Sequence, residues 1–290
     1  MSWQAYKLRF RLCSPLHIGR GKVGNLQLTR SYVTGRNLWG ALTARLARNS
    51  HPAGKPAPQT YVDVGERVNQ ELAFTYLFAT TNTDGSIETW PWEENFRYHY
   101  LSTYASTALD YSAASAEENS LHEVEYLMPH TREAGKQVYL TGYLFQRADS
   151  ALEWQSALAR LQVGGERGYG WGQLELVSDP QPLTAKQLFA KYSVTLPGER
   201  PLLRLTAEQR FLAHTLASNF EDSQAIPTAA ASITGSLEPL VGRETKRASK
   251  FGQQPSPARI CYVPGAFSQN ELKVQIGPYG IWGGTDAPPT

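Results

Sequence analysis

The chain has 290 residues, of which 41% are hydrophobic and 19% charged, and its formal net charge is +2. This composition is that of a globular protein large enough for two ordinary domains, and no apolar run is long enough to cross a bilayer, so disordered and membrane-spanning classes are excluded. A globally basic surface is also excluded, so any binding of nucleic acid must depend on local clusters of cations.

The cysteine and histidine content gives no sign of a metal site. Cys13 and Cys261 are the only cysteines and lie too far apart for a zinc motif or a disulfide framework, and the 6 histidines show no metal-ligand spacing. We expect neither a metal nor another cofactor. The first residues run directly into a strand-like pattern without the apolar core of a secretory signal, which predicts a cytoplasmic protein without membrane partners.

Residues 6–13 alternate strictly between apolar and polar side chains, which predicts a half-buried strand. Its apolar face carries Tyr6, Leu8, Phe10 and Leu12, and its polar face carries the cations Lys7, Arg9 and Arg11. Three cations on one face are either a solvated surface or a sheet that presents charge to nucleic acid.

A Gly-x-Gly-x-x-Gly pattern follows at residues 19–24, with Arg20 and Lys22 between its glycines. A dinucleotide-binding turn would open a helix at this point. Residues 25–33 have an extended pattern instead, so a Rossmann fold is excluded. The glycines, Arg20 and Lys22 remain candidates for close approach to RNA.

A helix is predicted after Gly35, with Asn37 as its N-cap and leucines spaced by four residues. Arg36 precedes it and therefore lies at the positive end of the helix dipole. A cation is unfavourable there unless it meets an anion, so Arg36 is a candidate phosphate ligand.

The rest of the first part alternates between predicted helices and strands. Helices are expected at residues 68–78 and 151–162, strands at 96–102, 121–127, 138–145 and 173–177, and an exposed polar loop at 103–119. The helix at residues 151–162 is predicted from Trp154, Leu158 and Leu161, which follow helical spacing. The order β, α, β, β, α, β predicts an α+β fold in which residues 1–178 form a ferredoxin-like (RNA-recognition-type) domain with insertions.

Residues 163–174 contain five glycines within nine residues, and we call them the glycine loop. Glycines accept positive φ and can present backbone N–H groups to phosphate, an arginine adds a bidentate donor, and aromatic rings offer faces to a base. The candidate RNA-binding residues here are Gly164, Gly165, Arg167, Gly168, Tyr169, Gly170 and Trp171. The alternative is a tight helix-to-strand connection with its aromatics in the core.

Prolines at residues 179–183 mark a boundary, beyond which residues 179–290 are predicted to form a second, smaller α+β domain, with a ferredoxin-like fold as one option. Residues 235–254 place cations between glycines with little apolar content: Arg243, Lys246, Arg247 and Lys250. This stretch is either a solvated loop or a basic segment that binds nucleic acid.

Three separated motifs resemble the RAMP superfamily of CRISPR-associated proteins. The turn at residues 15–19 (Pro-Leu-His-Ile-Gly) and the helix start at 32–42 match its N-terminal signature, with Thr34 in place of the usual proline and Trp39 in place of the usual arginine. The glycine loop resembles the glycine-rich loop of the family, and residues 107–110 with 120–125 resemble its mid-domain strands. The resemblance covers residues 6–177 and implies ferredoxin-like folds that bind CRISPR guide RNA within a multisubunit type III effector.

The resemblance also bears on which subunit this is. The backbone subunits that cut target RNA carry an aspartate between the first glycine turn and the helix motif, but residues 24–35 contain no Asp or Glu. A processing endonuclease has its glycine-rich loop near the C-terminus, whereas more than a hundred residues follow it here. The subunit that caps the 5′ tag of the guide RNA is the best match, with other effector subunits and target RNA as further partners.

The sequence shows no combination of nucleophile, base and orienting group that would indicate a catalytic site. His17, beside the glycine turn, is the one candidate for a general acid or base, and the alternative is a packing histidine. The leading hypothesis is a non-catalytic RNA-binding subunit in antiviral defence. A metal-independent CRISPR RNA-processing endoribonuclease, a backbone subunit and a subunit that touches only protein are the alternatives.

Overall fold

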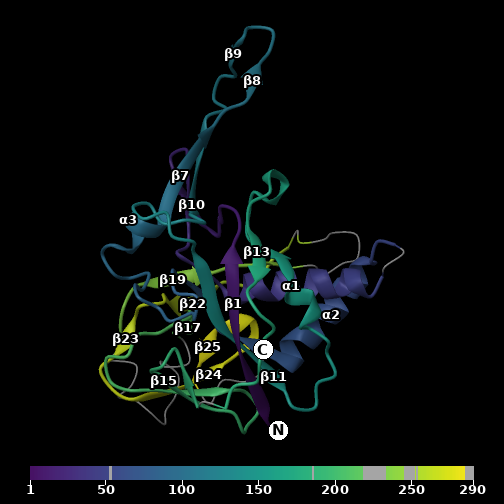
Figure 1. The fold of residues 1–290 in the computed structure, drawn as a ribbon, viewed down its shortest axis with the longest axis vertical. Coiled ribbons are helices and arrows are strands. Elements are labelled where there is room, and N and C mark those ends of the chain that lie inside the picture. Colours follow the sequence, from purple (N-terminus) through teal and green to yellow (C-terminus); the bar gives the residue numbers. More distant parts are fainter. Residues whose placement is uncertain (52–53, 185, 218–232, 245–251, 253, 285–290) are drawn as a thin grey trace.

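The computed structural model describes residues 1–51, 54–184, 186–217, 233–244, 252 and 254–284, and its fold is mixed α+β with many strands and few helices (Figure 1). A seven-stranded antiparallel sheet has the order β12-β13-β1-β11-β6-β4, with β5 also paired to β11. Its strands are β1 (Trp3–Leu12), β4 (Tyr32–Val33), β5 (Leu72–Phe74), β6 (Leu77–Thr80), β11 (Tyr139–Arg147), β12 (Arg160–Gln162) and β13 (Gln173–Leu176).

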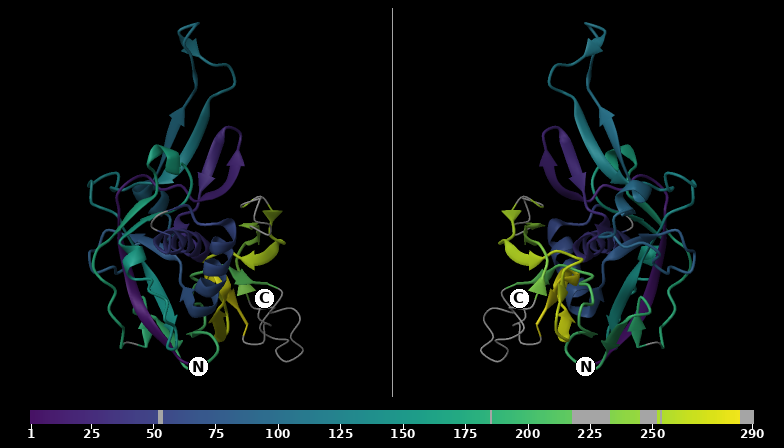
Figure 2. Two further views of the ribbon diagram at one scale, coloured as in Figure 1. Left: turned by 90° about the vertical axis from the view of Figure 1, so that its right-hand side faces the viewer. Right: turned by 90° about the vertical axis from the view of Figure 1, so that its left-hand side faces the viewer.

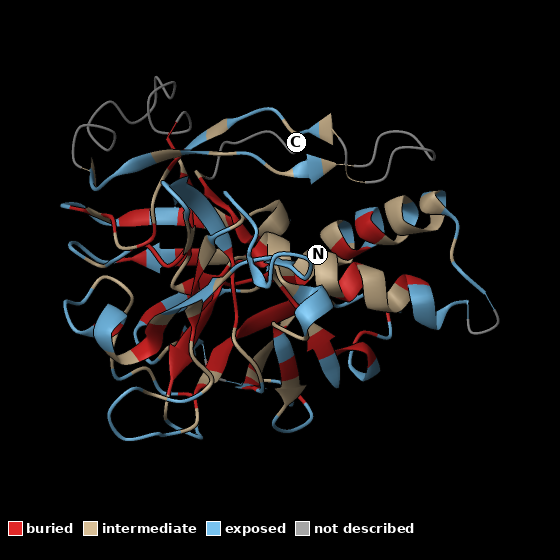
Figure 3. Ribbon diagram, turned by 90° about the horizontal axis from the view of Figure 1, so that it is seen from above, coloured by how far each residue is buried: buried red, intermediate tan, exposed pale blue. Residues whose placement is uncertain are grey.

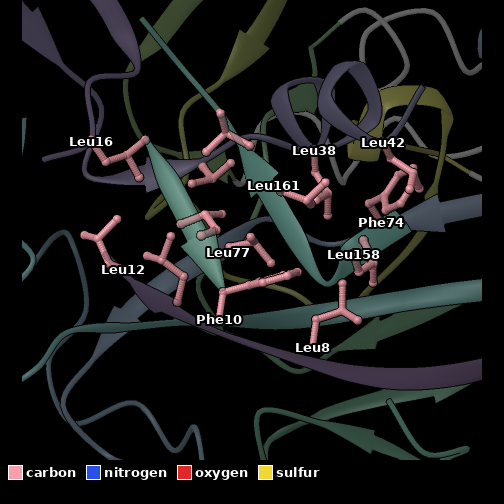
Figure 4. Packing of buried hydrophobic residues seen from close by; sticks show 14 of the residues in the cluster. Leu8, Phe10, Leu12, Leu16, Leu38, Leu42, Phe74, Leu77, Leu158 and Leu161 are labelled. Atoms are coloured by element: carbon pink, nitrogen blue, oxygen red, sulfur yellow. The ribbon is translucent and has the colours of Figure 1, made fainter. Parts of the chain in front are cut away.

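Strand β1 confirms the predicted alternation. Leu8, Phe10 and Leu12 are fully buried on the face that the helices cover (Figure 4). The cations of the other face are bonded to protein groups: Lys7 Nζ donates to the Asp84 carbonyl (2.6 Å), Arg9 donates to the Thr83 carbonyl (2.5 Å) and Ser178 Oγ (2.9 Å), and Arg11 pairs with Glu175. Burial lowers the pKa of Lys7. The three cations are therefore bonded to groups of the protein rather than free.

The described residues of the first part contain three α-helices: α1 (Gly35–Asn49), α2 (Pro58–Glu71) and α3 (Phe96–Tyr100). Helix α1 begins earlier than expected, because Thr34 rather than Asn37 is its N-cap and Thr34 Oγ1 accepts from the Asn37 amide at 3.3 Å. Helix α2 starts on Pro58, a favourable first residue, and ends at Glu71. The predicted helix at 68–78 is wrong beyond residue 71, since β5 and β6 follow.

Two further predictions of secondary structure are wrong. Residues 151–162 form only a 3-10 turn, η1 (Ser156–Leu158), followed by β12, although Trp154, Leu158 and Leu161 are buried as expected. Leu161 pairs with Leu174 in the sheet, so strand pairing overrides helical spacing. Residues 96–100 form α3, and the strand expected there starts at residue 101.

The second part is built from strands. Its eight-stranded sheet has the order β14-β15-β16-β24-β25-β17-β22-β19. These strands are β14 (Gln187–Leu188), β15 (Tyr192–Thr195), β16 (Leu202–Leu205), β17 (Thr215–Leu216), β19 (Leu237–Leu240), β22 (Arg259–Tyr262), β24 (Leu272–Ile276) and β25 (Trp282–Gly283). Short pairs join β18 (Ile233–Thr234) to β23 (Phe267–Ser268) and β20 (Arg243–Glu244) to β21 (Gln254–Pro255). Over the described residues from 186 onward there is no α-helix, only the 3-10 turn η4 (Pro278–Gly280), so the α+β character expected of this part is not observed there.

The two parts share a core. Helices α1 and α2 cover one face of the seven-stranded sheet, and the eight-stranded sheet packs on the other through a second apolar cluster that includes Trp3, Phe145, Leu203, Val274 and Trp282. The Leu183 amide donates to the Ala5 carbonyl at 2.8 Å, so the chain crosses between the parts along β1. Figure 3 shows the buried residues gathered in the strands at the centre of the molecule. The division at residue 178 stays a prediction.

A four-stranded sheet, β2-β3-β10-β7, extends beyond this body. It consists of β2 (Gly19–Val23), β3 (Leu26–Thr29), β7 (Leu101–Ser106) and β10 (His122–Leu127), and the hairpin of β8 (Leu109–Asp110) with β9 (Ser115–Ala116) forms its tip. We call residues 101–127 the arm, which projects far from the body (Figures 1 and 2). The loop predicted at 103–119 is the outer part of this arm. None of the described helices has the length and apolar character needed to cross a membrane.

Candidate nucleic-acid interface

A cleft of about 800 Å³ opens between the two parts, lined by residues of the turn after His17, α1, the glycine loop, β19, β22 and η4. Among the described residues, its lining contains five arginines and one carboxylate, namely Arg30, Arg36, Arg48, Arg167, Arg259 and Glu244. A concave site with such an excess of cations attracts anions, and the planar guanidinium matches phosphate geometry.

The glycine loop is fixed to the turn at residues 15–17 by close backbone contacts. Gly164 has φ +82°, and a Cβ there would lie 2.2 Å from the His17 carbonyl oxygen. Gly172 has φ +75°, and its Cβ would lie 1.8 Å from the Val163 carbonyl oxygen. The amides of Gly165 and Gly172 donate to the carbonyls of His17 (2.8 Å) and Pro15 (2.7 Å). Glycine is required here for backbone packing.

The tip of the loop is a 3-10 turn, η2 (Arg167–Tyr169), which Gly170 closes with φ +82°. The amides of residues 169, 170 and 171 donate to the carbonyls of Glu166 and Arg167 at 3.0–3.3 Å. These amides, like those of Gly165 and Gly172, already donate to acceptors within the protein. The amides of Gly164 and of residues 166–168 have no acceptor in the described part of the chain, so these amides and the Arg167 side chain are donors that the loop can offer to a ligand.

The two aromatics of the loop have different surroundings. Tyr169 is 83% exposed. Trp171 is half-buried, with its ring centroid 5.1 Å from that of Tyr126 and 6.1 Å from that of Tyr104, so it packs against the base of the arm. Only Tyr169 presents a whole ring to a ligand.

His17 is buried, with 6% of its surface exposed, and its Nδ1 lies 2.8 Å from the Glu125 carbonyl oxygen. Since a carbonyl only accepts, Nδ1 carries the proton. The His17 backbone also receives the glycine loop. This geometry favours the packing role over a general acid or base. In the described residues, no three His, Cys, Asp or Glu side chains are grouped as metal ligands.

Arg36, the candidate phosphate ligand, lies in the cleft, with its guanidinium carbon 4.6 Å from the centre of the Tyr279 ring. It donates to the Arg243 carbonyl at 3.1 Å and lies 3.9 Å from Glu244, so it links the start of α1 to β20. The Arg243 side chain is exposed beside the cleft. Lys246, Arg247 and Lys250 lie outside the described residues.

Arg20 and Lys22 are exposed on the hairpin of β2 and β3, beside the arm, and do not line the cleft. The structure therefore brings Arg36, Arg167 and Gly164 together and places this pair on a neighbouring surface. A ligand that contacts both sets must extend beyond the cleft.

A polar network at the base of the cleft joins the two parts. Arg30 Nη1 donates to Glu238 Oε1 at 2.6 Å, and His214 Nε2 lies 2.5 Å from the same oxygen. Tyr76 Oη lies 2.7 Å from His214 Nδ1, and Arg30 Nη1 lies 3.5 Å from Tyr32 Oη. His214 thus donates from Nε2 to the carboxylate and accepts at Nδ1 from Tyr76. We call these five residues the bridging network.

Burial controls the protonation of the bridging network. It lowers the pKa of His214, which is fully buried, and raises the pKa of Tyr32 to about 12. Partial burial also raises the pKa of Glu238, but the hydrogen bond from His214 and the charge of Arg30 outweigh it and bring that pKa to about 2. The network therefore holds a neutral histidine and a charged Arg30–Glu238 pair.

The fold has a counterpart among solved structures. No protein-family model and no curated protein matches the sequence. The structure is similar to a chain of Type III-B Cmr-beta bound to cognate target RNA and AMPPnP, with a TM-score of 0.51 and 12% identity over 91% of this chain and 86% of that chain. A chain of Type III-B Cmr-beta bound to cognate target RNA gives a TM-score of 0.40 and 12% identity over 59% of this chain and 96% of that chain. At this identity the likeness concerns the fold alone.

Sequence reasoning missed several residues of the cleft. Arg30, Arg259 and Tyr279 come from segments far apart in the chain, and single charges or rings in isolation carry no signal. In the sequence, Arg48 is only a cation near the end of a predicted helix, which does not indicate a binding role. The glycines and tyrosine around residues 277–280 were the one local sign that another backbone approaches closely there, since a Cβ on Gly280 would lie 2.6 Å from the Phe74 carbonyl oxygen.

Proposed function

We propose that the chain is a non-catalytic RNA-binding subunit of a type III CRISPR ribonucleoprotein effector, and that it holds the 5′ tag of the guide RNA in the cleft. The arginine-lined cleft beside the glycine loop carries this proposal, because besides Arg30, which pairs with Glu238, its described lining holds four arginines and one carboxylate. Arg167 and Arg36 bind phosphates, and Tyr169 stacks a base at the rim.

The topology supports a ferredoxin-like assignment for residues 1–178. The antiparallel order β13-β1-β11-β6 is the order that a βαββαβ chain produces when its strands are β1, β6, β11 and β13. Helices α1 and α2 form the first crossover, and η1 replaces the helix of the second. We propose residues 179–290 as a separate domain that closes the cleft from the opposite side.

The likeness to a Type III-B Cmr-beta chain supports placement in a type III effector, since that protein is bound to cognate target RNA and this chain shares its fold over 91% of its length. Guide RNA, target RNA and the other effector subunits are the proposed partners. The cap position is favoured over a backbone position because residues 24–35 lack the aspartate with which backbone subunits cut target RNA.

RNA affinity tests the phosphate contacts in the cleft. Arg167→Gln and Arg36→Gln are each expected to reduce the slope of log K against log salt by about 0.7, the value for one phosphate contact on a single strand. The measurement is fluorescence anisotropy of a labelled single-stranded RNA over a salt series. Arg204→Gln is the matched control, since Arg204 is exposed, pairs with Glu271 and lines neither this cleft nor its neighbours. Unchanged slopes for both cleft variants would refute the proposal.

Subunit position is tested by stoichiometry and by the bound RNA. The chain is co-expressed with the other subunits of its complex, and the purified particle is analysed by native mass spectrometry and RNA sequencing. A cap subunit is present once per guide, and the guides share one 5′ tag. Several copies per guide would instead identify a backbone subunit.

The arm is expected to contribute nothing to the affinity for free RNA. Residues 98–131 contain no Lys or Arg, and Asp110, Glu117, Glu118 and Glu123 make the arm acidic. Replacing residues 107–121 by Asn-Gly joins β7 to β10 through a two-residue turn. The salt slope and the affinity of this variant should equal those of the intact chain in the same anisotropy assay, and a reduced slope would contradict the assignment of RNA contacts to the cleft.

A further inference from the structure

A second cavity, of about 540 Å³, adjoins the cleft and is lined by the end of β1, the outer half of α1, β12 and β13. We call it the helix groove. Arg48 and Arg167 line both the cleft and the helix groove, as do Ala41, Ala44 and Gln162. The two cavities are therefore neighbours that share part of their lining.

Arginines outnumber carboxylates in the lining of the helix groove as strongly as in the cleft. Its lining contains the arginines Arg11, Arg45, Arg48, Arg160 and Arg167 and one carboxylate, Glu175. Arg11 forms a salt bridge with that carboxylate. Among the described residues, the other four arginines have no carboxylate within 4.0 Å.

These arginines are held together by the fold rather than by opposite charges. Arg45 Nη2 donates to the Arg160 carbonyl at 2.8 Å, which fixes α1 against β12 and places the Arg45 guanidinium beside the backbone of Arg160. The Arg160 side chain itself is exposed. Like charges held close together repel one another, and a bound polyanion relieves that repulsion.

The lining of the helix groove also includes small and apolar side chains. Ala41 and Ala44 come from α1, and Leu161 and Leu174 from the paired strands β12 and β13. Short side chains let a ligand backbone approach the helix, while the arginines stand at the rim. This combination suits an extended strand of phosphates and sugars better than a compact anion.

We propose that the helix groove is a second phosphate-binding site, in which a single-stranded RNA that leaves the cleft continues past Arg48 and Arg167 to Arg45 and Arg160. The inference rests on the proposed function of the cleft and adds the path of the strand. Glu175 lowers the affinity of this site for RNA, because it neutralises Arg11 and its negative charge repels the phosphates.

Two substitutions at residues that line the helix groove but not the cleft test the proposal. Arg160→Gln removes an exposed cation and is expected to weaken binding of an RNA of about 20 nucleotides by about threefold and to lower the salt slope by about 0.7. Glu175→Gln is expected to strengthen binding by about threefold, an effect that misfolding cannot imitate. Arg204→Gln is the control for loss of one positive charge, and Arg36→Gln reports on the cleft alone.

The outcomes separate the helix groove from the cleft. Weaker binding by Arg160→Gln together with stronger binding by Glu175→Gln supports the second site. If Arg36→Gln weakens binding while both groove variants equal the intact chain, the second site is overturned and the function of the cleft stands. If the intact chain binds no RNA, both proposals fail.

Discussion

Replacing Gly172 by alanine is expected to lower the free energy of unfolding by about 3 kcal/mol, because it combines a disfavoured backbone conformation with a backbone clash. The new Cβ would lie 1.8 Å from the Val163 carbonyl oxygen at a φ of +75°. The backbone segments at Val163 and Gly172 cannot easily move apart, since the Gly172 amide donates to the Pro15 carbonyl and the Gly172 carbonyl accepts from the Val163 amide at 2.9 Å. Urea unfolding followed by tryptophan fluorescence measures the loss.

Gly168→Ala is the matched control within the same loop. A Cβ at Gly168 meets nothing within 4 Å, and its φ lies outside the left-handed region. We expect a change within about 0.5 kcal/mol, typical of an exposed substitution. Equal destabilisation by the two alanines would show that the glycines act through general flexibility, and would contradict the backbone-packing role of Gly172.

Local sequence patterns correctly predicted the elements whose burial follows a regular spacing along the chain. Strand β1 followed from strict alternation, because Leu8, Phe10 and Leu12 share one buried face, and α1 followed from leucines spaced by four residues, because Leu38 and Leu42 are buried on one side of the helix. The N-cap was placed at Asn37 rather than Thr34 because both residue types cap helices well. Only the hydrogen bond from the Asn37 amide to Thr34 Oγ1 decides between them.

The wrong helix at residues 151–162 shows where such patterns stop being informative. Trp154, Leu158 and Leu161 fit a helical stripe, yet the same three side chains become buried from an extended segment, a 3-10 turn and a strand. Pairing with β13 supplies hydrogen bonds that a helix would have supplied itself. The sequence alone does not contain that partner.

The cleft was predictable only in part. The glycine loop and Arg36 carry local signals, namely glycine density and a cation at a helix start. The opposite wall comes from residues about 200 positions later, and nothing in a sequence marks Arg259 or Tyr279 as neighbours of α1. The bridging network was missed for the same reason, since His214 and Glu238 are unremarkable until the fold places them against Arg30.

Replacing Glu238 by alanine is expected to lower the free energy of unfolding by about 3 kcal/mol at pH 7, because it leaves the Arg30 guanidinium unpaired at the base of the cleft. The side chain of Arg30 is 11% exposed and that of Glu238 16% exposed, so water replaces little of the lost interaction. Glu271→Ala is the control, because it breaks the exposed Arg204–Glu271 pair, in which both side chains are more than half exposed. That change should cost about 0.5 kcal/mol or less.

The pH dependence of this loss distinguishes the ion pair from simple packing. The pKa of Glu238 is about 2 in the folded protein, against 4.5 for an ordinary glutamate. Its charge therefore stabilises the fold fully above the higher value, and the contribution disappears as the pH falls toward the lower one. The difference in unfolding free energy between the intact chain and Glu238→Ala should be constant above about pH 5 and shrink between pH 4.5 and 2. A difference that stays the same across that range would mean that Glu238 stabilises the junction by packing, and that the two walls of the cleft are not joined by charge.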